Sequence, residues 1–235
     1  MRYSVEVIGP EGTWYKELPS VTEIVDKVMA KRGLHDWYYK QGVVGFSQLL
    51  DLYGDMLPHD VPSLHSLMST KGLSPYAQRD ALQKIGSKVH HAMASLGVGK
   101  RHKGDQAIFD TYPELESWWG EGERTVLAVE QTLLSMRYGF AGTCDLVYEQ
   151  YGLNTMADYK TGSMYDSHII QVELYRWAYE EMGLGHIDRL NIIQLPRDGS
   201  PVKENIIQLS DDLTTAAEGV LYLYQWNGGK KRRGK

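Results

Sequence analysis

Two acidic residues and a lysine stand close together in a stretch whose composition is typical of β-strands. Asp145 lies in apolar sequence, and thirteen residues later Asp158 stands two positions before Lys160. Because side chains alternate along a strand, we expect Asp158 and Lys160 to point the same way. Mg²⁺ and Mn²⁺ prefer oxygen ligands such as carboxylates. A nearby lysine suits a reaction in which water attacks a phosphate and negative charge builds up. The residue types therefore predict a metal-dependent nuclease.

The surroundings of the Asp158–Lys160 tripeptide add to this prediction. Alone it carries little information, because an Asp–Lys pair at a strand end is usually a solvated surface pair. Asp145, however, lies in apolar strand sequence, where an uncompensated charge would be costly. Gln171 and Tyr175 follow in a predicted helix, and residues four apart share one helix face. The combination favours a site over a surface pair.

In this order and spacing, the motifs resemble those of the PD-(D/E)xK nuclease superfamily, specifically its RecB-like exonuclease branch. They are similar to the mitochondrial genome maintenance exonuclease type and to phage exonucleases. The resemblance rests on Gly142-Thr-Cys-Asp145, Asp158-Tyr-Lys-Thr-Gly162, Gln171-x-x-x-Tyr175, Gly86-x-x-x-His90 and the segment Leu18–Ile24. It covers most of residues 18–180 and implies a restriction-endonuclease-like core that uses Mg²⁺ or Mn²⁺.

The resemblance implies a metal-binding role for several of these residues. Asp145 and Asp158 would be the main ligands, and the backbone carbonyl of Tyr159 would complete the shell. His90 would be a further ligand from a helix, a role that imidazole fills better for Mn²⁺ than for Mg²⁺. The spacing alone does not decide whether His90 or His91 faces the metal.

The remaining motif residues are implied in catalysis and substrate binding. Lys160 would orient or deprotonate the attacking water and stabilise the transition state. Glu130, fifteen residues before Asp145, would lie at the periphery of the site, through water or as a second-metal ligand. Gln171 and Tyr175 would hold the DNA backbone or brace the site. Without the resemblance, Glu130 and Gln171 read as surface residues and Tyr175 as a core residue.

Hydrophobic periodicity predicts an α/β fold with helical N-terminal decoration, and the resemblance implies a central mixed β-sheet flanked by helices. One nuclease domain is expected over 1–227, with decoration over about 1–75, a catalytic core over about 76–227 and a basic tail over 228–235. Strands are predicted over 125–134, 139–148 and 153–160 as an antiparallel meander, and over 189–195 and 202–209. Helices are predicted over 20–30, 35–54, 76–96, 113–119, 165–182 and 211–226. Residues 55–74 and 98–110 are predicted to be loops.

Contacts with nucleic acid are predicted mainly in the second of these loops. Lys100, Arg101 and Lys103 are candidate phosphate contacts, and Trp37–Tyr39 and Trp118-Trp119 are candidates for base stacking. The alternative is a purely structural role, in which these aromatic residues belong to the hydrophobic core. The basic tail would add salt-sensitive attraction to phosphates, or else serve as a dispensable segment or an addressing signal.

The composition limits the classes of protein. The single cysteine excludes an internal disulfide, a zinc ribbon and a Cys₄ iron–sulfur cluster. No long apolar run predicts a membrane span or a signal peptide, so a cytoplasmic protein without a membrane partner is expected, in the host cytoplasm if phage-encoded. The net charge is −5, and the acidic balance is weak evidence against DNA binding.

The sequence thus predicts a Mg²⁺- or Mn²⁺-dependent DNA exonuclease that acts in recombination, repair or replication. Its partners would be DNA, as single strands or duplex ends, and a recombination or single-strand-binding protein. The alternatives are a nuclease-like module that binds DNA or a partner without cleaving, a structure-specific endonuclease of the same superfamily, and a metal-dependent hydrolase of another ester.

Overall fold

The computed structural model describes residues 2–9, 12–31 and 33–233. The chain divides into two compact units. The sheet unit comprises Met1–Ala30 and His90–Lys235, and the helical unit comprises Lys31–Val89. The long helix α4 (Pro75–Gly97) begins in the helical unit and contributes its last residues, from His90, to the sheet unit.

The helical unit consists of α2 (Leu34–Tyr53), the 3₁₀ turn η1 (Gly54–Met56), α3 (Val61–Thr70) and the first part of α4. The loop predicted over 55–74 is therefore wrong for most of its length. Two local features that favour a helix were missed: the Asp60 carboxylate accepts a hydrogen bond from the Ser63 N–H at 2.9 Å, and a proline stands in the first turn of α3. Gly45 of α2 lies so close to Leu73 that a Cβ there would be 2.1 Å from the Leu73 carbonyl oxygen.

A five-stranded mixed sheet with strand order β3-β4-β5-β6-β7 forms the centre of the sheet unit. Its strands are β3 (Thr125–Ser135), β4 (Phe140–Gln150), β5 (Leu153–Lys160), β6 (Arg189–Gln194) and β7 (Lys203–Gln208). Neighbouring strands are antiparallel except β5 and β6, which are parallel. The α/β class, the mixed sheet flanked by helices and the β3-β4-β5 meander are confirmed.

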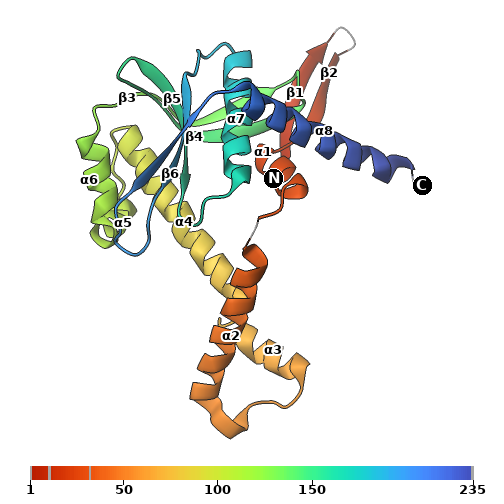
Figure 1. The fold of residues 1–235 in the computed structure, drawn as a ribbon, viewed down its shortest axis with the longest axis vertical. Helices are drawn as coiled ribbons and strands as arrows, with labels where there is room; N and C mark the ends of the chain where they lie inside the picture. The colour runs from red at the N-terminus through yellow and green to blue at the C-terminus, as the bar shows by residue number, and fades with distance from the viewer. Residues whose placement is uncertain (1, 10–11, 32, 234–235) are drawn as a thin grey trace. The chain divides into compact units, whose positions relative to one another are not determined.

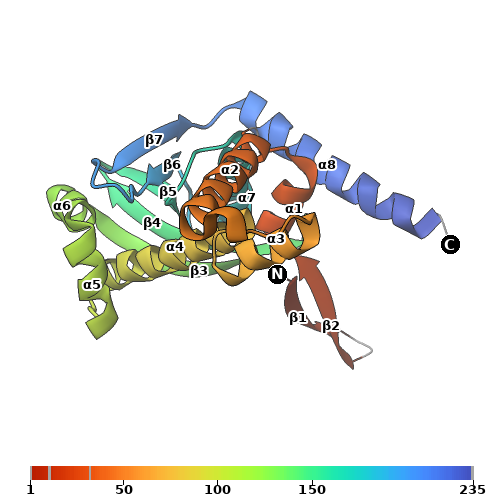
Figure 2. The ribbon, with the colours of Figure 1, turned by 90° about the horizontal axis from the view of Figure 1, so that it is seen from below.

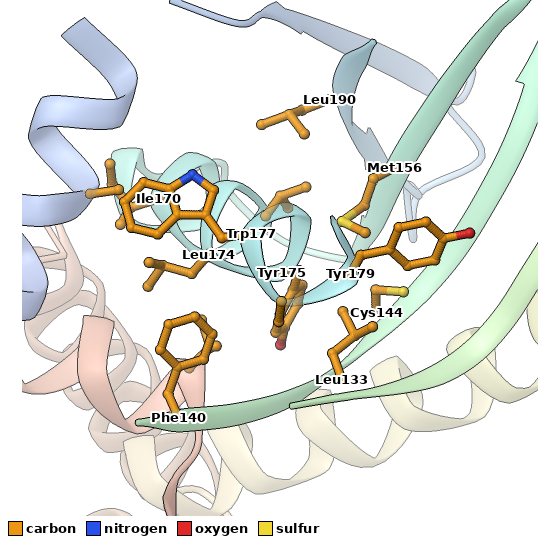
Figure 3. Packing of buried hydrophobic residues seen from close by; sticks show 14 of the residues in the cluster. Leu133, Phe140, Cys144, Met156, Ile170, Leu174, Tyr175, Trp177, Tyr179 and Leu190 are labelled. Atoms are coloured by element: carbon orange, nitrogen blue, oxygen red, sulfur yellow. The ribbon is translucent and has the colours of Figure 1, made fainter. Parts of the chain in front are cut away.

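Three helices pack together with this sheet: α1 (Val21–Val28), α7 (Asp166–Glu181) and α8 (Asp211–Arg233) (Figure 1). Ser20 caps α1 by accepting the Glu23 N–H at 3.0 Å, and Ser210 caps α8 by accepting the Leu213 N–H at 3.2 Å. α7 contributes more residues to the main core cluster of the described chain than any other single element. Figure 3 shows its Leu174, Tyr175 and Trp177 among buried side chains of β3, β4 and β5.

The remaining elements lie at the margins of the sheet unit. A separate hairpin consists of β1 (Arg2–Gly9) and β2 (Gly12–Pro19), and α5 (Lys103–Thr111) and α6 (Pro113–Glu121) precede β3 (Figure 2). The loop predicted over 98–110 is wrong from Lys103 onward. The Asp105 carboxylate accepts the His102 N–H at 2.8 Å, and this starts α5.

Two further predictions concern membrane spans and the basic tail. Within the described residues, no helix combines the length and the apolar character needed to cross a bilayer. The backbone of α8 continues through Arg233, and the last two residues of the basic tail lie outside the described residues.

Candidate active site

The candidate site forms where β4 and β5 separate. Their antiparallel pairing runs from Gln150 and Leu153 to Leu146 and Ala157, so Asp145 and Asp158 are the next residues on the two strands. The Asp145 carboxylate accepts a hydrogen bond from the Tyr159 N–H at 2.7 Å. The Asp145 carboxylate thus replaces a backbone carbonyl as the acceptor for this N–H. The register of the sheet therefore brings the two acidic residues together, as the sequence predicts.

Both carboxylates are buried, Asp145 to 8% exposure and Asp158 to 2%. Burial raises the pKa of Asp158 to about 6, with the Asp145 charge adding to the rise and Lys160 opposing it. Burial acts in the same direction on Asp145, but His90, Lys160 and the Tyr159 N–H together hold its pKa below the usual value. Two like charges in one buried place each disfavour ionisation of the other. The pair therefore concentrates negative charge in a buried place.

Lys160 lies at the end of β5 and forms an ion pair with Asp158. Burial lowers the pKa of Lys160, but the charges of Asp158 and Asp145 outweigh it and raise the pKa above the usual value. Its backbone carbonyl accepts the Leu195 N–H at 2.8 Å, which continues the parallel pairing of β5 with β6 beyond Gln194. The lysine is therefore a fixed ammonium ion beside the carboxylates.

The histidine that faces the carboxylates is His90. Its Nδ1 lies 3.4 Å from Oδ2 of Asp145, and its ring meets the Tyr159 ring edge-on with centroids 5.8 Å apart. Burial lowers the pKa of His90, but Asp145 and Asp158 together outweigh burial, so the net shift is upward. His91 stacks on His102 instead, with centroids 5.4 Å apart. His90, rather than His91, is therefore the neighbour of Asp145.

Gln171 and Tyr175 of α7 meet one another beside the site. The Gln171 amide donates to the Tyr175 hydroxyl at 2.8 Å, and both side chains are buried. Burial and the Asp158 charge raise the pKa of Tyr175 far above its usual value. Gly142 lies against the Tyr175 ring. A Cβ at position 142 would be only 2.3 Å from Cε1 of Tyr175. The first glycine of the Gly142–Asp145 motif therefore makes room for the tyrosine of the helix motif.

Glu130 lies opposite Asp145 on β3, at a break in the regular pairing. The register passes from Val129 with Leu146 to Gln131 with Cys144, and Glu130 has a positive φ of 48°. Burial and the Asp145 charge raise the pKa of Glu130. Non-glycine residues rarely adopt this conformation, and such strain occurs often at functional sites. The location of Glu130 beside Asp145 agrees with its predicted position at the periphery of the site.

Besides Gln171 and Tyr175, three basic residues were predicted to contact the substrate: Lys100, Arg101 and Lys103. Arg101 forms an ion pair with Glu116, and its guanidinium lies 5.4 Å from the centroid of the Phe109 ring. Lys103 is the first residue of α5 and Lys100 precedes it in the exposed connection. Within the described residues, none of the three forms a hydrogen bond or ion pair with the buried carboxylates. Their proposed role in binding stays a prediction.

Sequence reasoning missed residues of α1 that border the site. Thr22 is hydrogen-bonded to the Tyr175 hydroxyl, and the Asp26 charge contributes to the raised pKa of Lys160. An open cavity of about 530 Å³ lies beside them and is lined by Tyr3, Ser20, Thr22, Glu23, Asp26 and Lys27. Thr22 lies within the motif Leu18–Ile24, but that motif assigns it no role, and Asp26 lies outside the motif.

The donor set can be compared with the needs of a metal ion. Within the described residues, no group of three or more His, Cys, Asp and Glu side chains is arranged to hold one. Two carboxylates and a neighbouring backbone carbonyl are nevertheless hard oxygen donors of the kind that Mg²⁺ and Mn²⁺ bind, usually together with waters. Oδ2 of Asp158 is buried and has no hydrogen-bond partner among the described residues, although Lys160 approaches it. The chemistry of the site fits a small divalent cation.

Comparisons with known proteins add little. No family model matches the chain, and no curated protein matches it. Among solved structures, one described as the crystal structure of SSO0001 is similar to 46% of this chain and 55% of its own chain, at 16% identity and a TM-score of 0.26. The chain thus spans about half the length of that structure, and a likeness this weak supports no inference about fold or function.

Proposed function

We propose that this protein is a Mg²⁺- or Mn²⁺-dependent deoxyribonuclease, and specifically an exonuclease. We base the proposal on one observation: Asp145 and Asp158 are buried opposite one another where two strands separate, with Lys160 paired to Asp158. The resemblance of the motifs to the RecB-like branch of the PD-(D/E)xK nucleases supports DNA as the substrate and exonucleolytic action in recombination, repair or replication.

The metal would be held by Asp145, Asp158 and the carbonyl of Tyr159, and when bound it would activate water and neutralise charge on the scissile phosphate. His90 would keep Asp145 ionised, because its contact lowers the pKa of that carboxyl group. Tyr175 and Gln171 would fix the position of β4 beside the site through Gly142. These residues would thus prepare the carboxylates before a substrate arrives.

Lys160 would act through its positive charge. Its raised pKa keeps the ammonium form at neutral pH, and an ammonium ion cannot accept a proton from water. It would instead orient the attacking water and stabilise the negative charge that develops on the phosphate in the transition state. The proposal therefore assigns electrostatic stabilisation to Lys160 rather than general-base catalysis.

The test is a cleavage assay with end-labelled single-stranded, duplex and circular DNA in Mg²⁺, Mn²⁺ or EDTA. Wild type, Lys160→Ala and the matched control Lys16→Ala, an exposed lysine of β2, are compared. Wild type and the control should degrade linear DNA only with metal and spare circles, and Lys160→Ala should be inactive. Cleavage of circles would make it an endonuclease. DNA binding without cleavage by wild type would replace the proposal with a binding module.

A further inference from the structure

An open cleft adjoins the candidate site at the ends of the two parallel strands. It has a volume of about 460 Å³, and its lining includes Thr161, Gly162, Gln194, Arg197, Asp198 and Lys203. We call it the β5–β6 cleft. Thr161 follows Lys160 directly, and Gln194 is the β6 partner of Lys160. Ligands of α/β sheets commonly bind beyond the carboxyl ends of parallel strands.

The two cations of the cleft have no partner of their own. Within the described residues, neither Arg197 nor Lys203 forms an ion pair or side-chain hydrogen bond. Arg197 is only partly exposed, and its guanidinium comes within 4.0 Å of where a Gly162 Cβ would be. A planar guanidinium can donate two parallel hydrogen bonds to a phosphate, and a lysine adds a flexible point charge.

The one carboxylate in the lining does not neutralise these cations. The Asp198 side chain accepts hydrogen bonds from the Ser200 N–H at 3.1 Å and the Ser200 hydroxyl at 2.6 Å. These bonds keep the pKa of Asp198 below its usual value, so it remains charged at the rim. The amide of Gln194 is also engaged, since it donates to the Gly162 carbonyl at 3.3 Å. Arg197 and Lys203 are thus the charged groups of the lining that are left to bind an anionic ligand.

We propose that the β5–β6 cleft binds a phosphate of the nucleic-acid strand next to the phosphate that is cleaved, through Arg197 and Lys203. This inference rests on the proposed nuclease function. A strand that enters the site must approach two buried carboxylates, which repel its phosphates. Cations one loop away offset this repulsion and hold the strand in register with Lys160. A polyanion that occupies both places gains more than a free anion bound in either one.

The first test measures binding of a labelled single-stranded oligonucleotide by fluorescence anisotropy in EDTA, over a range of salt concentrations. Arg197→Gln should weaken binding about tenfold, as for loss of one charge-assisted contact. The slope of log affinity against log salt should fall by about 0.7. Asp198→Asn should tighten binding about twofold, since it removes a screened surface charge. Lys16→Gln is the matched control, because the β1–β2 hairpin lies apart from β6 and β7 in Figure 2.

The second test finds the phosphate by cleavage of oligonucleotides that carry one neutral methylphosphonate at successive positions. One position near the scissile bond should slow wild type but cause no further loss in Arg197→Gln, as for two partners of one interaction. If Arg197→Gln matches Lys16→Gln in affinity and salt slope while wild type cleaves, the cleft proposal is overturned and the nuclease stands. If wild type neither binds nor cleaves DNA, both proposals fail.

Discussion

Gly142→Ala tests how closely α7 is fitted to the site. The new methyl group would lie 2.3 Å from Cε1 and 3.0 Å from Cδ1 of Tyr175, well inside normal contact distance. The ring is 4% exposed and its hydroxyl is bonded to Gln171, so it cannot move away cheaply. Overpacking of this kind costs roughly 1–3 kcal/mol. For a folded unit of this size, each kcal/mol lowers the melting temperature by about 2–4 °C.

The matched control is Gly219→Ala, the same chemical change at an exposed position within α8, where the new methyl group meets nothing within 4 Å. It should raise stability by up to about 1 kcal/mol, because alanine favours helix more than glycine does. Both variants are compared by thermal unfolding without metal. The double variant Gly142→Ala/Tyr175→Leu should recover part of the loss that Gly142→Ala alone causes. Equal melting temperatures for Gly142→Ala and wild type would refute the close approach of Gly142 and Tyr175.

Four further predictions follow from buried charge. Asp158→Asn should abolish Mn²⁺ binding in calorimetry, yet raise metal-free stability at pH 7 by at most about 3 kcal/mol, because burial raises the pKa of Asp158 to about 6. That raised pKa means the folded state binds the proton more tightly, so stability should fall as pH rises from about 4 to 6 in wild type but less in the variant. For the same reason Mn²⁺ affinity should weaken below about pH 6, as protons compete for the carboxylate; a pH-independent affinity would contradict this. Glu173→Ala should cost about 3–5 kcal/mol in urea unfolding, because the fully buried carboxylate binds Arg176 and the Trp177 indole N–H.

The strands of the sheet were predictable because their periodicity is strong and local. β3, β4 and β5 alternate or run apolar between turn residues, and the resulting meander brings Asp145 and Asp158 to neighbouring strands. That they are direct neighbours at the end of the pairing depends on register. Register is fixed by packing on α7, which strand patterns do not contain.

The errors in the helical predictions have a local cause. α5 begins with His102 and Asp105, an unusual capping pair that does not match the Ser/Thr pattern used to find helix starts. α3 begins at Asp60 and a proline, in sequence rich in residues that also favour loops. In both segments the cap decided the outcome over the polar composition.

The residues of the site that were missed depend on contacts between distant parts of the chain. Thr22 reaches Tyr175 because Ser20 pairs with Ala141 at the start of β4, which positions α1 over α7. Arg197 borders the site because β6 runs parallel to β5 and both end at the same edge. A single sequence shows the types of these residues but not which residues lie beside them in the fold. The position of Thr22 thus depends on a bridge outside the main strand pairing, and that of Arg197 on the order of the strands.

The charges of the site are hard to explain by stability alone. Asp145 and Asp158 are buried side by side, and the pKa of Asp158 is raised because its ionised form is disfavoured there. Well-packed apolar residues at such positions would often leave a fold as stable or more stable. Glu130 adds a strained backbone at the same place. A cation bound between the carboxylates would remove their mutual repulsion and leave Lys160 free to face a phosphate. A loss of folding stability from buried charges is therefore expected of a metal-dependent nuclease. The change in the free energy of unfolding caused by Asp158→Asn measures this loss directly.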